Sequence, residues 1–185
     1  MREITIINRH PRLRLNRRAL SRALAHLDTH FRFTTADMPA LGVGGLRRAK
    51  KHVVAVKSAS SPAPPSAAPA GELSISFLTD PALARLHAEH LDDPSTTDVI
   101  TFEGAEALGY AGDICVSVDT ALAYAAKHKV PFADELLRYI IHGWLHLAGY
   151  DDLQPGKKRR LRAAEERALK LLRAAKLLPA FTLRP

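Results

Sequence analysis

The sequence contains a single cysteine, Cys115, among its 185 residues. One thiol excludes an internal disulfide framework and a cysteine-rich zinc finger. No stretch approaches the roughly 18 uninterrupted apolar residues that a membrane-spanning helix needs. The N-terminal segment MREITIINRH also lacks the apolar core and the small-residue cleavage site of a secretory signal. We therefore expect a cytoplasmic protein without a membrane partner.

Aromatic residues make up only 6% of the chain, so the sequence offers no obvious platform for stacking nucleic-acid bases. Basic residues, in contrast, are abundant. Lys and Arg number 27 against 19 Asp and Glu, which gives a formal net charge of +8. Such an excess favours polyanionic partners through phosphate contacts and the release of counterions. It also suits an arginine- and alanine-rich proteome, so the charge alone does not decide the partner.

The hydrophobic pattern predicts one domain over residues 1–185, interrupted by a surface insertion at about 35–71. Within the insertion, residues 58–71 hold four prolines with small residues and no charge, which is typical of a linker. We expect a short edge strand at 52–56, inside this insertion.

Alternating and periodic patterns predict the regular elements on both sides of the insertion. Asn16 and Asp119 are the expected N-caps of two helices, and Gly149 is the expected stop of a third. The expected strands are 4–7, 72–77, 97–102 and 113–118; the expected helices are 17–31, a short one from 80, 119–129, 131–148 and 155–178.

The last predicted helix carries nine Lys and Arg between residues 155 and 178, against Glu165 and Glu166. A solvated basic face on a packed helix is the commoner meaning of such a run. A surface that faces RNA is the alternative.

The most informative segment is HGWLHLAGYDD, which begins at His142. A helix places His142 and His146 on one face, so both imidazoles can reach one ion. Gly149 lets the chain turn back after the helix, so that Asp151 or Asp152 can complete the site. Two histidines and one carboxylate leave coordination positions open for water, which is the pattern of catalytic rather than structural zinc.

Histidine pairs at this spacing are more often packing residues than ligands, but here the helix, the glycine stop and the acid pair coincide. The residue after His142 is Gly143 rather than glutamate, so the helix lacks the general base of a metalloprotease. A peptidase is therefore disfavoured. We expect Gly143 to permit close packing or access to the ion.

The same segment resembles the HGxLHLxGYDH signature of the YbeY family, which are bacterial metal-dependent endoribonucleases. Residues 96–102, TTDVITF, resemble the family's PTDVLSF strand, and residues 112–114 resemble its GDI strand. Residues 83–86 correspond to the family helix that precedes the TDV strand. These matches agree in order and spacing and together cover about residues 72–170.

The resemblance implies an α+β fold, in which helices flank a small mixed sheet of four strands and one helix carries a zincin-like His-x3-His pair. It implies hydrolysis of phosphodiester bonds in single-stranded RNA by a metal-activated water. The implied role is maturation of the 16S rRNA 3′ end and ribosome quality control. Ribosomal RNA and the ribosome or its small subunit are the implied partners.

By position, the resemblance assigns His142, His146 and Asp152 as metal ligands. Asp152 stands where the family usually has a third histidine, and Asp151 corresponds to the family's own aspartate. One divalent ion, normally zinc, is the implied cofactor. An aspartate ligand makes the site harder, so we expect more tolerance of manganese or iron.

A second departure concerns the arginine with which the family meets the RNA phosphate, because Leu91 stands in its place. Charge that develops in the transition state then needs another cation. His90, Arg85 or a basic residue of the last helix are candidates. The usual family asparagine is His87 in this chain.

Three residues are candidates to support the metal site. Asp98 and Asp113 can accept hydrogen bonds from metal-bound histidines, although caps or turns explain both residues equally well. His90 is the third candidate. Cys115, on an interior strand, is expected to be buried and unreactive.

Two other functions stay open. Loss of the arginine favours a catalytically weak, metal-binding factor that acts on the ribosome or on RNA during maturation, whereas an open three-ligand site opposes it. The other alternative is a metal-dependent hydrolase of a different class. Cleavage of RNA, but not of peptides or small esters, would exclude it.

Overall fold

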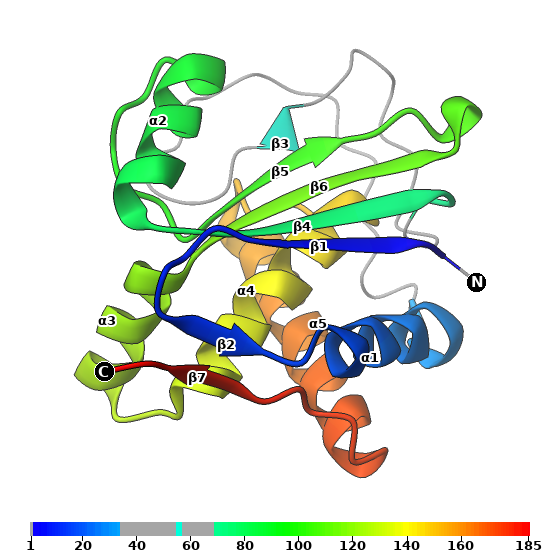
Figure 1. Ribbon diagram of the computed structural model, residues 1–185. Coiled ribbons are helices and arrows are strands. Elements are labelled where there is room, and N and C mark those ends of the chain that lie inside the picture. Colours follow the sequence, from blue (N-terminus) through cyan, green and yellow to red (C-terminus); the bar gives the residue numbers. More distant parts are fainter. Residues whose placement is uncertain (1, 34–54, 57–68) are drawn as a thin grey trace.

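The computed structural model describes residues 2–33, 55–56 and 69–185 (Figure 1). Most of the insertion predicted at 35–71 therefore lies outside the described residues. In chain order the elements are β1 (Ile4–Asn8), β2 (Leu13–Leu15), α1 (Arg17–His30), β3 (Ala55–Val56), β4 (Glu72–Leu78), α2 (Asp80–Leu91), β5 (Val99–Glu103), the 3-10 helix η2 (Glu106–Leu108), β6 (Tyr110–Ser117), α3 (Val118–His128), α4 (Phe132–Leu147), α5 (Pro155–Ala174) and β7 (Phe181–Leu183).

The mixed sheet is present with helices on both faces, which confirms the α+β fold (Figure 1). The strand order is β1-β4-β6-β5-β3. Strand β4 runs parallel to both β1 and β6, whereas β5 is antiparallel to β6. The two-residue β3 pairs in parallel with β5 and extends the expected four strands at that edge. It lies within the segment 52–56, where we expected an edge strand.

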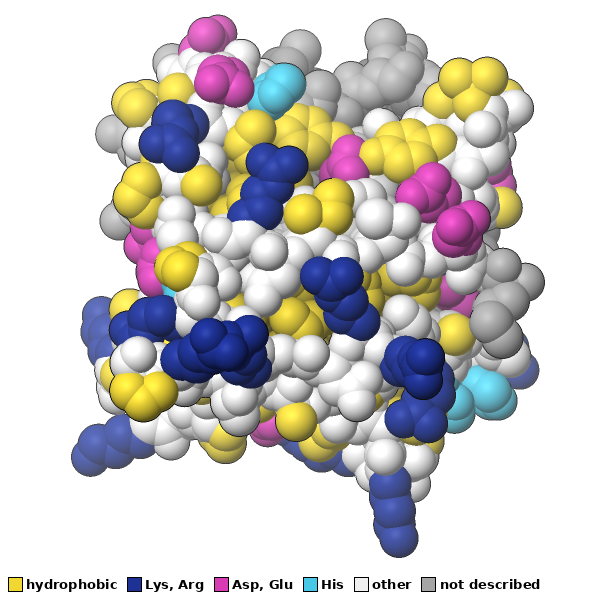
Figure 2. Space-filling view, in the orientation of Figure 1, with side chains coloured by type: hydrophobic (Ala, Val, Ile, Leu, Met, Phe, Trp, Pro, Cys, Tyr) yellow, Lys and Arg dark blue, Asp and Glu magenta, His cyan; other side chains and the backbone are white. Residues whose placement is uncertain are grey.

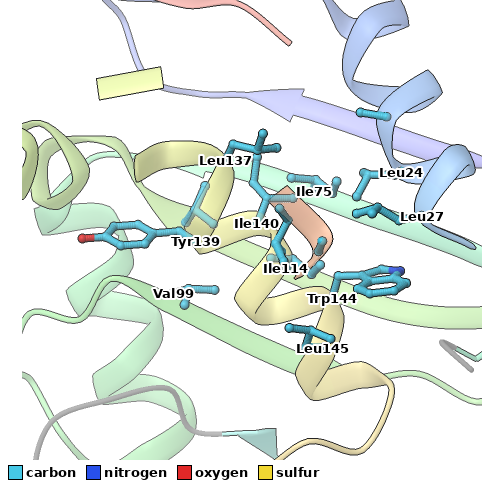
Figure 3. Close-up of a cluster of buried hydrophobic side chains, with 14 of the residues drawn as sticks. Leu24, Leu27, Ile75, Val99, Ile114, Leu137, Tyr139, Ile140, Trp144 and Leu145 are labelled. Carbon is cyan, nitrogen blue, oxygen red and sulfur yellow. The ribbon is translucent and has the colours of Figure 1, made fainter. Parts of the chain in front are cut away.

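Helix α4 occupies the centre of the main core. Of its 16 residues, 11 are buried, so the helix is apolar on almost every side and must be enclosed. Figure 3 shows Ile140 of α4 pointing toward Ile75 and Ile114 of the sheet, whereas Trp144 extends toward Leu27 of α1. Although α4 is strongly apolar, no helix in the described part of the chain is long and apolar enough to cross a membrane.

The opposite face of the sheet carries a smaller hydrophobic cluster under α2, which includes Leu83, Ile100 and Cys115. Burial raises the pKa of the Cys115 thiol to about 12. The thiolate is the reactive form of cysteine, so this environment suppresses its reactivity. The expectation of a buried cysteine is confirmed.

A second sheet, which the sequence did not predict, pairs β2 with β7 in antiparallel orientation. Leu13 lies opposite Leu183, so strands of three residues join the two ends of the chain. Strands this short show no readable alternation. The prediction that the last helix continues to 178 was wrong, because α5 ends at Ala174 and Lys176 takes a left-handed conformation with φ of +56°.

The predicted N-caps had different outcomes. Asn16 caps α1 as expected, since its side chain accepts a hydrogen bond from the backbone N–H of Ala19. The prediction of Asp119 as the cap of α3 was wrong. Ser117 is the cap and accepts a hydrogen bond from the N–H of Thr120. Asp119 instead lies in the first turn and accepts a hydrogen bond from the start of α2, which ties two helices together.

Gly143 brings α4 into close contact with the sheet. A Cβ atom at this position would lie 2.6 Å from Cγ2 of Ile114 and 3.2 Å from Oγ1 of Thr101. Real Cβ atoms do not approach other atoms this closely, so only glycine at this position allows the helix to pack so near to β5 and β6. The expectation that Gly143 permits close packing is confirmed.

We expect Gly143→Ala to lower the free energy of unfolding by about 1–2 kcal/mol. Overpacking in a core costs about 1–3 kcal/mol, and the better helix propensity of alanine offsets up to about 1 kcal/mol. Urea unfolding followed by the fluorescence of Trp144 measures the change. Gly156→Ala in α5 is the matched control, because nothing lies within 4 Å of its added Cβ. Equal stability of the two variants would contradict the packing argument.

Candidate metal centre

The C-terminal half of α4 brings two histidine rings together. Nε2 of His142 lies 3.0 Å from Nε2 of His146, and the ring centroids are 4.6 Å apart with an interplanar angle of 64°. The two positions are i and i+4, so the helix itself places them on one face. His146 is buried and the side chain of His142 is 15% exposed, so the pair lies at the margin of the core.

The other ring nitrogen of each histidine faces a hydrogen-bond acceptor. Nδ1 of His142 donates to Oε1 of Glu165 at 2.6 Å, and Nδ1 of His146 donates to the carbonyl oxygen of Tyr150 at 2.9 Å. A carboxylate and a carbonyl only accept, which assigns the proton of each neutral ring to Nδ1. Both Nε2 atoms then present lone pairs to the same space. Two converging lone pairs fit a cation.

Asp152 reaches the same place from the loop after α4. One ligand atom each from His142, His146 and Asp152 lie within 4.8 Å of one another. The loop turns back because Gly149 adopts a φ of +95°, while the N–H of Tyr150 bonds to the carbonyl of Leu145. This is a Schellman turn, which favours glycine at its left-handed position.

Asp151 is engaged elsewhere. Its Oδ1 accepts a hydrogen bond from the N–H of Leu153, and its Oδ2 forms an ion pair with Nζ of Lys157 at 2.7 Å. The sequence left the choice between Asp151 and Asp152 open. The structure brings Asp152, rather than Asp151, to the histidine pair.

The pKa values of the two histidines are shifted in opposite directions. Burial lowers the pKa of His142, but the hydrogen bond to Glu165 and the charges of Glu165, Asp98 and Asp152 outweigh it and hold this pKa above its ordinary value. Burial and the neighbouring His142 lower the pKa of His146 to about 3. His146 therefore stays neutral near physiological pH and keeps its Nε2 lone pair for an ion.

Glu165 is the site residue that sequence reasoning missed. It projects from α5, is 4% exposed, and lies within hydrogen-bond reach of a predicted ligand on another helix. A signal was present, since Glu165 stands four residues after Leu161 and three before Ala168, inside the apolar stripe of α5. A carboxylate in such a stripe is buried and needs a partner.

Arg138 of α4 holds this carboxylate from the other side. Its Nη1 lies 3.4 Å from Oε2 of Glu165, and its Nη2 lies 2.8 Å from Oε1 of the more exposed Glu166. The helix pair α4 and α5 is thus joined by an arginine and two glutamates. Only Glu165 continues the chain of contacts to His142.

The other predicted support residues are not in the cluster. Oδ1 of Asp98 accepts from the N–H of Val99 at the start of β5, and its charge reaches both histidines. Asp113 pairs in register with Phe102, and His90 packs edge-on against the Phe102 ring. Phe102 packs against the hydrophobic cluster under α2. Asp113 and His90, which both neighbour Phe102, therefore lie on the side of the sheet opposite α4.

Two departures from the family pattern fall on α2. His87, in the place of the family asparagine, is buried and its Nδ1 lies 2.8 Å from the carbonyl oxygen of Ser95. It holds the loop before β5. Leu91, in the place of the family arginine, is the last residue of α2, and its side chain lies outside what the structure describes.

A family model described as "Endoribonuclease YbeY" matches residues 45–173. The chain belongs to this family. Its YbeY relatives include "Endoribonuclease YbeY" of Porphyromonas gingivalis strain W83, which is 42% identical over 103 residues, covering 56% of this chain and 68% of the relative. The same-named protein of Phocaeicola vulgatus is 37% identical over 102 residues, covering 55% and 74%.

A solution structure of a Thermotoga maritima protein aligns over 94% of both chains with a TM-score of 0.49 and 17% identity. Membership of the YbeY family confirms the resemblance read from the signature. It also confirms the prediction of an enzyme, because the YbeY relatives are endoribonucleases, which act on phosphodiester bonds of RNA.

We expect Glu165→Gln to weaken zinc binding by roughly 10–100-fold, the usual effect of removing a carboxylate that orients a histidine ligand. Competition with a fluorescent chelator measures the dissociation constant. Glu166→Gln is the matched control, since Glu166 also pairs with Arg138 but does not touch a histidine. If both variants weakened binding equally, the loss would come from the helix pairing rather than from orientation of His142.

The third ligand is tested by elemental mass spectrometry of the purified protein. We expect about one transition ion per chain, lost in Asp152→Ala and retained in Asp151→Ala, because only Asp152 lies with the histidines. Asp152→His should retain the ion and favour zinc over manganese more strongly, since imidazole is the softer ligand. Metal that survives Asp152→Ala but not Asp151→Ala would reverse the assignment.

Proposed function

We propose that residues 1–185 act as one metal-dependent endoribonuclease domain that cleaves single-stranded ribosomal RNA in the cytoplasm. Maturation of the 16S rRNA 3′ end and ribosome quality control are the proposed tasks, with the small ribosomal subunit as the partner. The observation that carries the proposal is the convergence of two imidazole Nε2 atoms and one carboxylate at the end of α4. Membership of the YbeY family supports it.

His142, His146 and Asp152 would hold the ion. When bound, a divalent cation would lower the pKa of a water molecule and polarise a phosphoryl oxygen of the RNA. The protein groups behind the ligands keep them ready for this task. Glu165 fixes the ring of His142, and the carbonyl of Tyr150 fixes the ring of His146, so neither ring needs to reorient.

The same donor set supports a proposal about the metal. A third histidine would make the site softer, whereas Asp152 adds a hard oxygen and one negative charge. We propose zinc as the usual ion, with manganese or iron as acceptable substitutes.

The chain needs a cation to replace the family arginine at Leu91. We propose Lys157, at the start of α5, because its ion pair with Asp151 holds it beside the loop that carries Asp152. The exposed arginines of α5, such as Arg159 and Arg162, would contact the RNA backbone without reading its sequence. Their contribution would weaken as salt rises.

The second candidate is a metal-binding maturation factor with little catalytic activity. The leucine at position 91 is the observation that favours it, since the family cation for the phosphate is missing there. Cleavage by the purified protein separates the two candidates.

We expect the purified protein to cleave a single-stranded oligoribonucleotide, to lose this activity in excess chelator, and to regain it when zinc or manganese is restored. His146→Ala should lower the cleavage rate by more than about 100-fold, because even residues behind metal ligands cost 10–100-fold. Gel electrophoresis of end-labelled RNA measures the rate.

His128→Ala is the control, because His128 is exposed and stacks on Tyr124 of α3, away from the cluster. Cleavage that is equal in His146→Ala and wild type would point to a contaminating nuclease and reject the proposed active site. Stoichiometric metal without cleavage would favour the maturation factor.

A further inference from the structure

Strand β1 forms one edge of the main sheet. In the described residues it pairs only with β4. The carbonyl of Glu3 accepts from the N–H of Leu73, and the N–H of Arg9 donates to the carbonyl of Phe77. Backbone groups of a strand alternate between its two sides, so Ile4 and Ile6 direct their N–H and C=O groups away from the sheet.

A hollow runs along this edge, between β1 and the first half of α1. It has a volume of about 610 Å³ and is lined by Ile4–Ile6 of the strand and by Arg17, Arg18, Ser21 and Arg22 of the helix. Figure 2 shows the hollow below the sheet, with hydrophobic side chains in its floor and Lys or Arg side chains beside it. An apolar floor, a strand edge and three cations thus face one space.

The cations of the hollow are available for a partner. Arg17, Arg18 and Arg22 are exposed, and within the described ranges none of them forms an ion pair. Ser21 is engaged with the helix itself, since its hydroxyl donates to the carbonyl of Arg17. Three guanidinium groups along one edge, without an ion pair to any residue that the structure describes, favour a negatively charged partner and guide it to the strand.

The edge itself has few of the features that prevent strand addition. Natural edges are blunted by proline, by a bulge or by a charge within the strand. β1 reads ITIIN, with none of these, and its register with β4 is regular over all five residues. A second strand can therefore continue the ladder.

We propose that the outer edge of β1, together with Arg17, Arg18 and Arg22, is a docking site for an extended acidic segment of a partner protein, which adds to the sheet as a further strand. The backbone of the segment would bond to Ile4 and Ile6, and alternate acidic side chains would meet the arginines. This site is independent of the metal cluster and of the RNA that the cluster cleaves.

A peptide fits the hollow better than RNA does. No aromatic ring lines it, so bases have nothing to stack on. The free N–H and C=O groups of a strand match the donors and acceptors of another peptide one for one, whereas phosphates only accept. The apolar floor also suits β-branched side chains.

The test uses a labelled heptapeptide that alternates Glu with Val, blocked at both ends, and the full chain with its metal. We expect binding by fluorescence anisotropy, weakened at least tenfold in the Arg18→Glu/Arg22→Glu double variant. Arg159→Glu/Arg162→Glu on α5 is the matched control, with the same change in net charge, and should bind within about twofold of wild type. Arg18 lies in the first turn of α1, where an acidic residue is favourable, and Arg22 is an exposed position, so the double variant should fold.

Strand addition has its own signature. Hydrogen exchange of the Ile4 and Ile6 amides, followed by NMR, should slow by at least tenfold with the peptide. A peptide methylated on alternate backbone nitrogens should neither bind nor protect these amides.

Three results would overturn the proposal. Binding that is unchanged by the double reversal would place the peptide elsewhere on the molecule. Protection of the same amides by a single-stranded RNA oligomer, with no binding of the peptide, would make the hollow an RNA site. If neither the peptide nor the RNA bound, the arginines would serve only to prevent aggregation at the sheet edge.

Discussion

The enclosure of α4 between the sheet and α5 is the constraint on which the rest of this molecule depends. The helix is buried over most of its surface, so its position is set on two sides at once. Gly143 allows the approach to the sheet, and the contacts of Arg138 with Glu165 and Glu166 join the helix to α5. The histidine pair follows from that enclosure, because rigid elements hold a site more accurately than loops do.

The cluster also shows how a buried site manages polar groups. Glu165 is almost fully buried, which is costly for a carboxylate unless it is paired and hydrogen-bonded. It has both kinds of partner, an arginine on one oxygen and an imidazole on the other. Burial also restricts the motion of the Glu165 side chain, so its carboxylate can fix the ring of His142. An acid on the surface, with a freely moving side chain, could not hold the ring in this way.

The sequence predicted those parts of the site that local pattern controls. His142 and His146 are one helical turn apart, Gly149 forms the expected turn, and Asp152 follows it, so one short segment contains them all. Glu165 lies far from this segment along the chain, and only the packing of α5 on α4 brings it to His142. The β2–β7 sheet was missed for the same reason, because it joins the two ends of the chain through strands of three residues.

The cap of α3 illustrates a finer limit. Ser117 and Asp119 are both good capping residues, and the sequence cannot rank them because each can accept the same kind of hydrogen bond. Tertiary structure decides the outcome: Asp119 is drawn to the start of α2 and to His10, which leaves Ser117 to cap the helix. Local preference thus selects a small set of candidates, and long-range contacts choose among them.

The same distinction applies to charge. A net charge of +8 describes the chain as a whole and does not say where the cations lie. In the structure some cations form ion pairs between helices, as Arg138 does with Glu166 and Arg173 does with Asp134. Others, such as Arg18 and Arg22, lie along a sheet edge without an acidic partner in the described residues. Paired cations mainly organise the protein, whereas unpaired ones beside free backbone groups are disposed for a partner, so a basic sequence need not mean one continuous nucleic-acid surface.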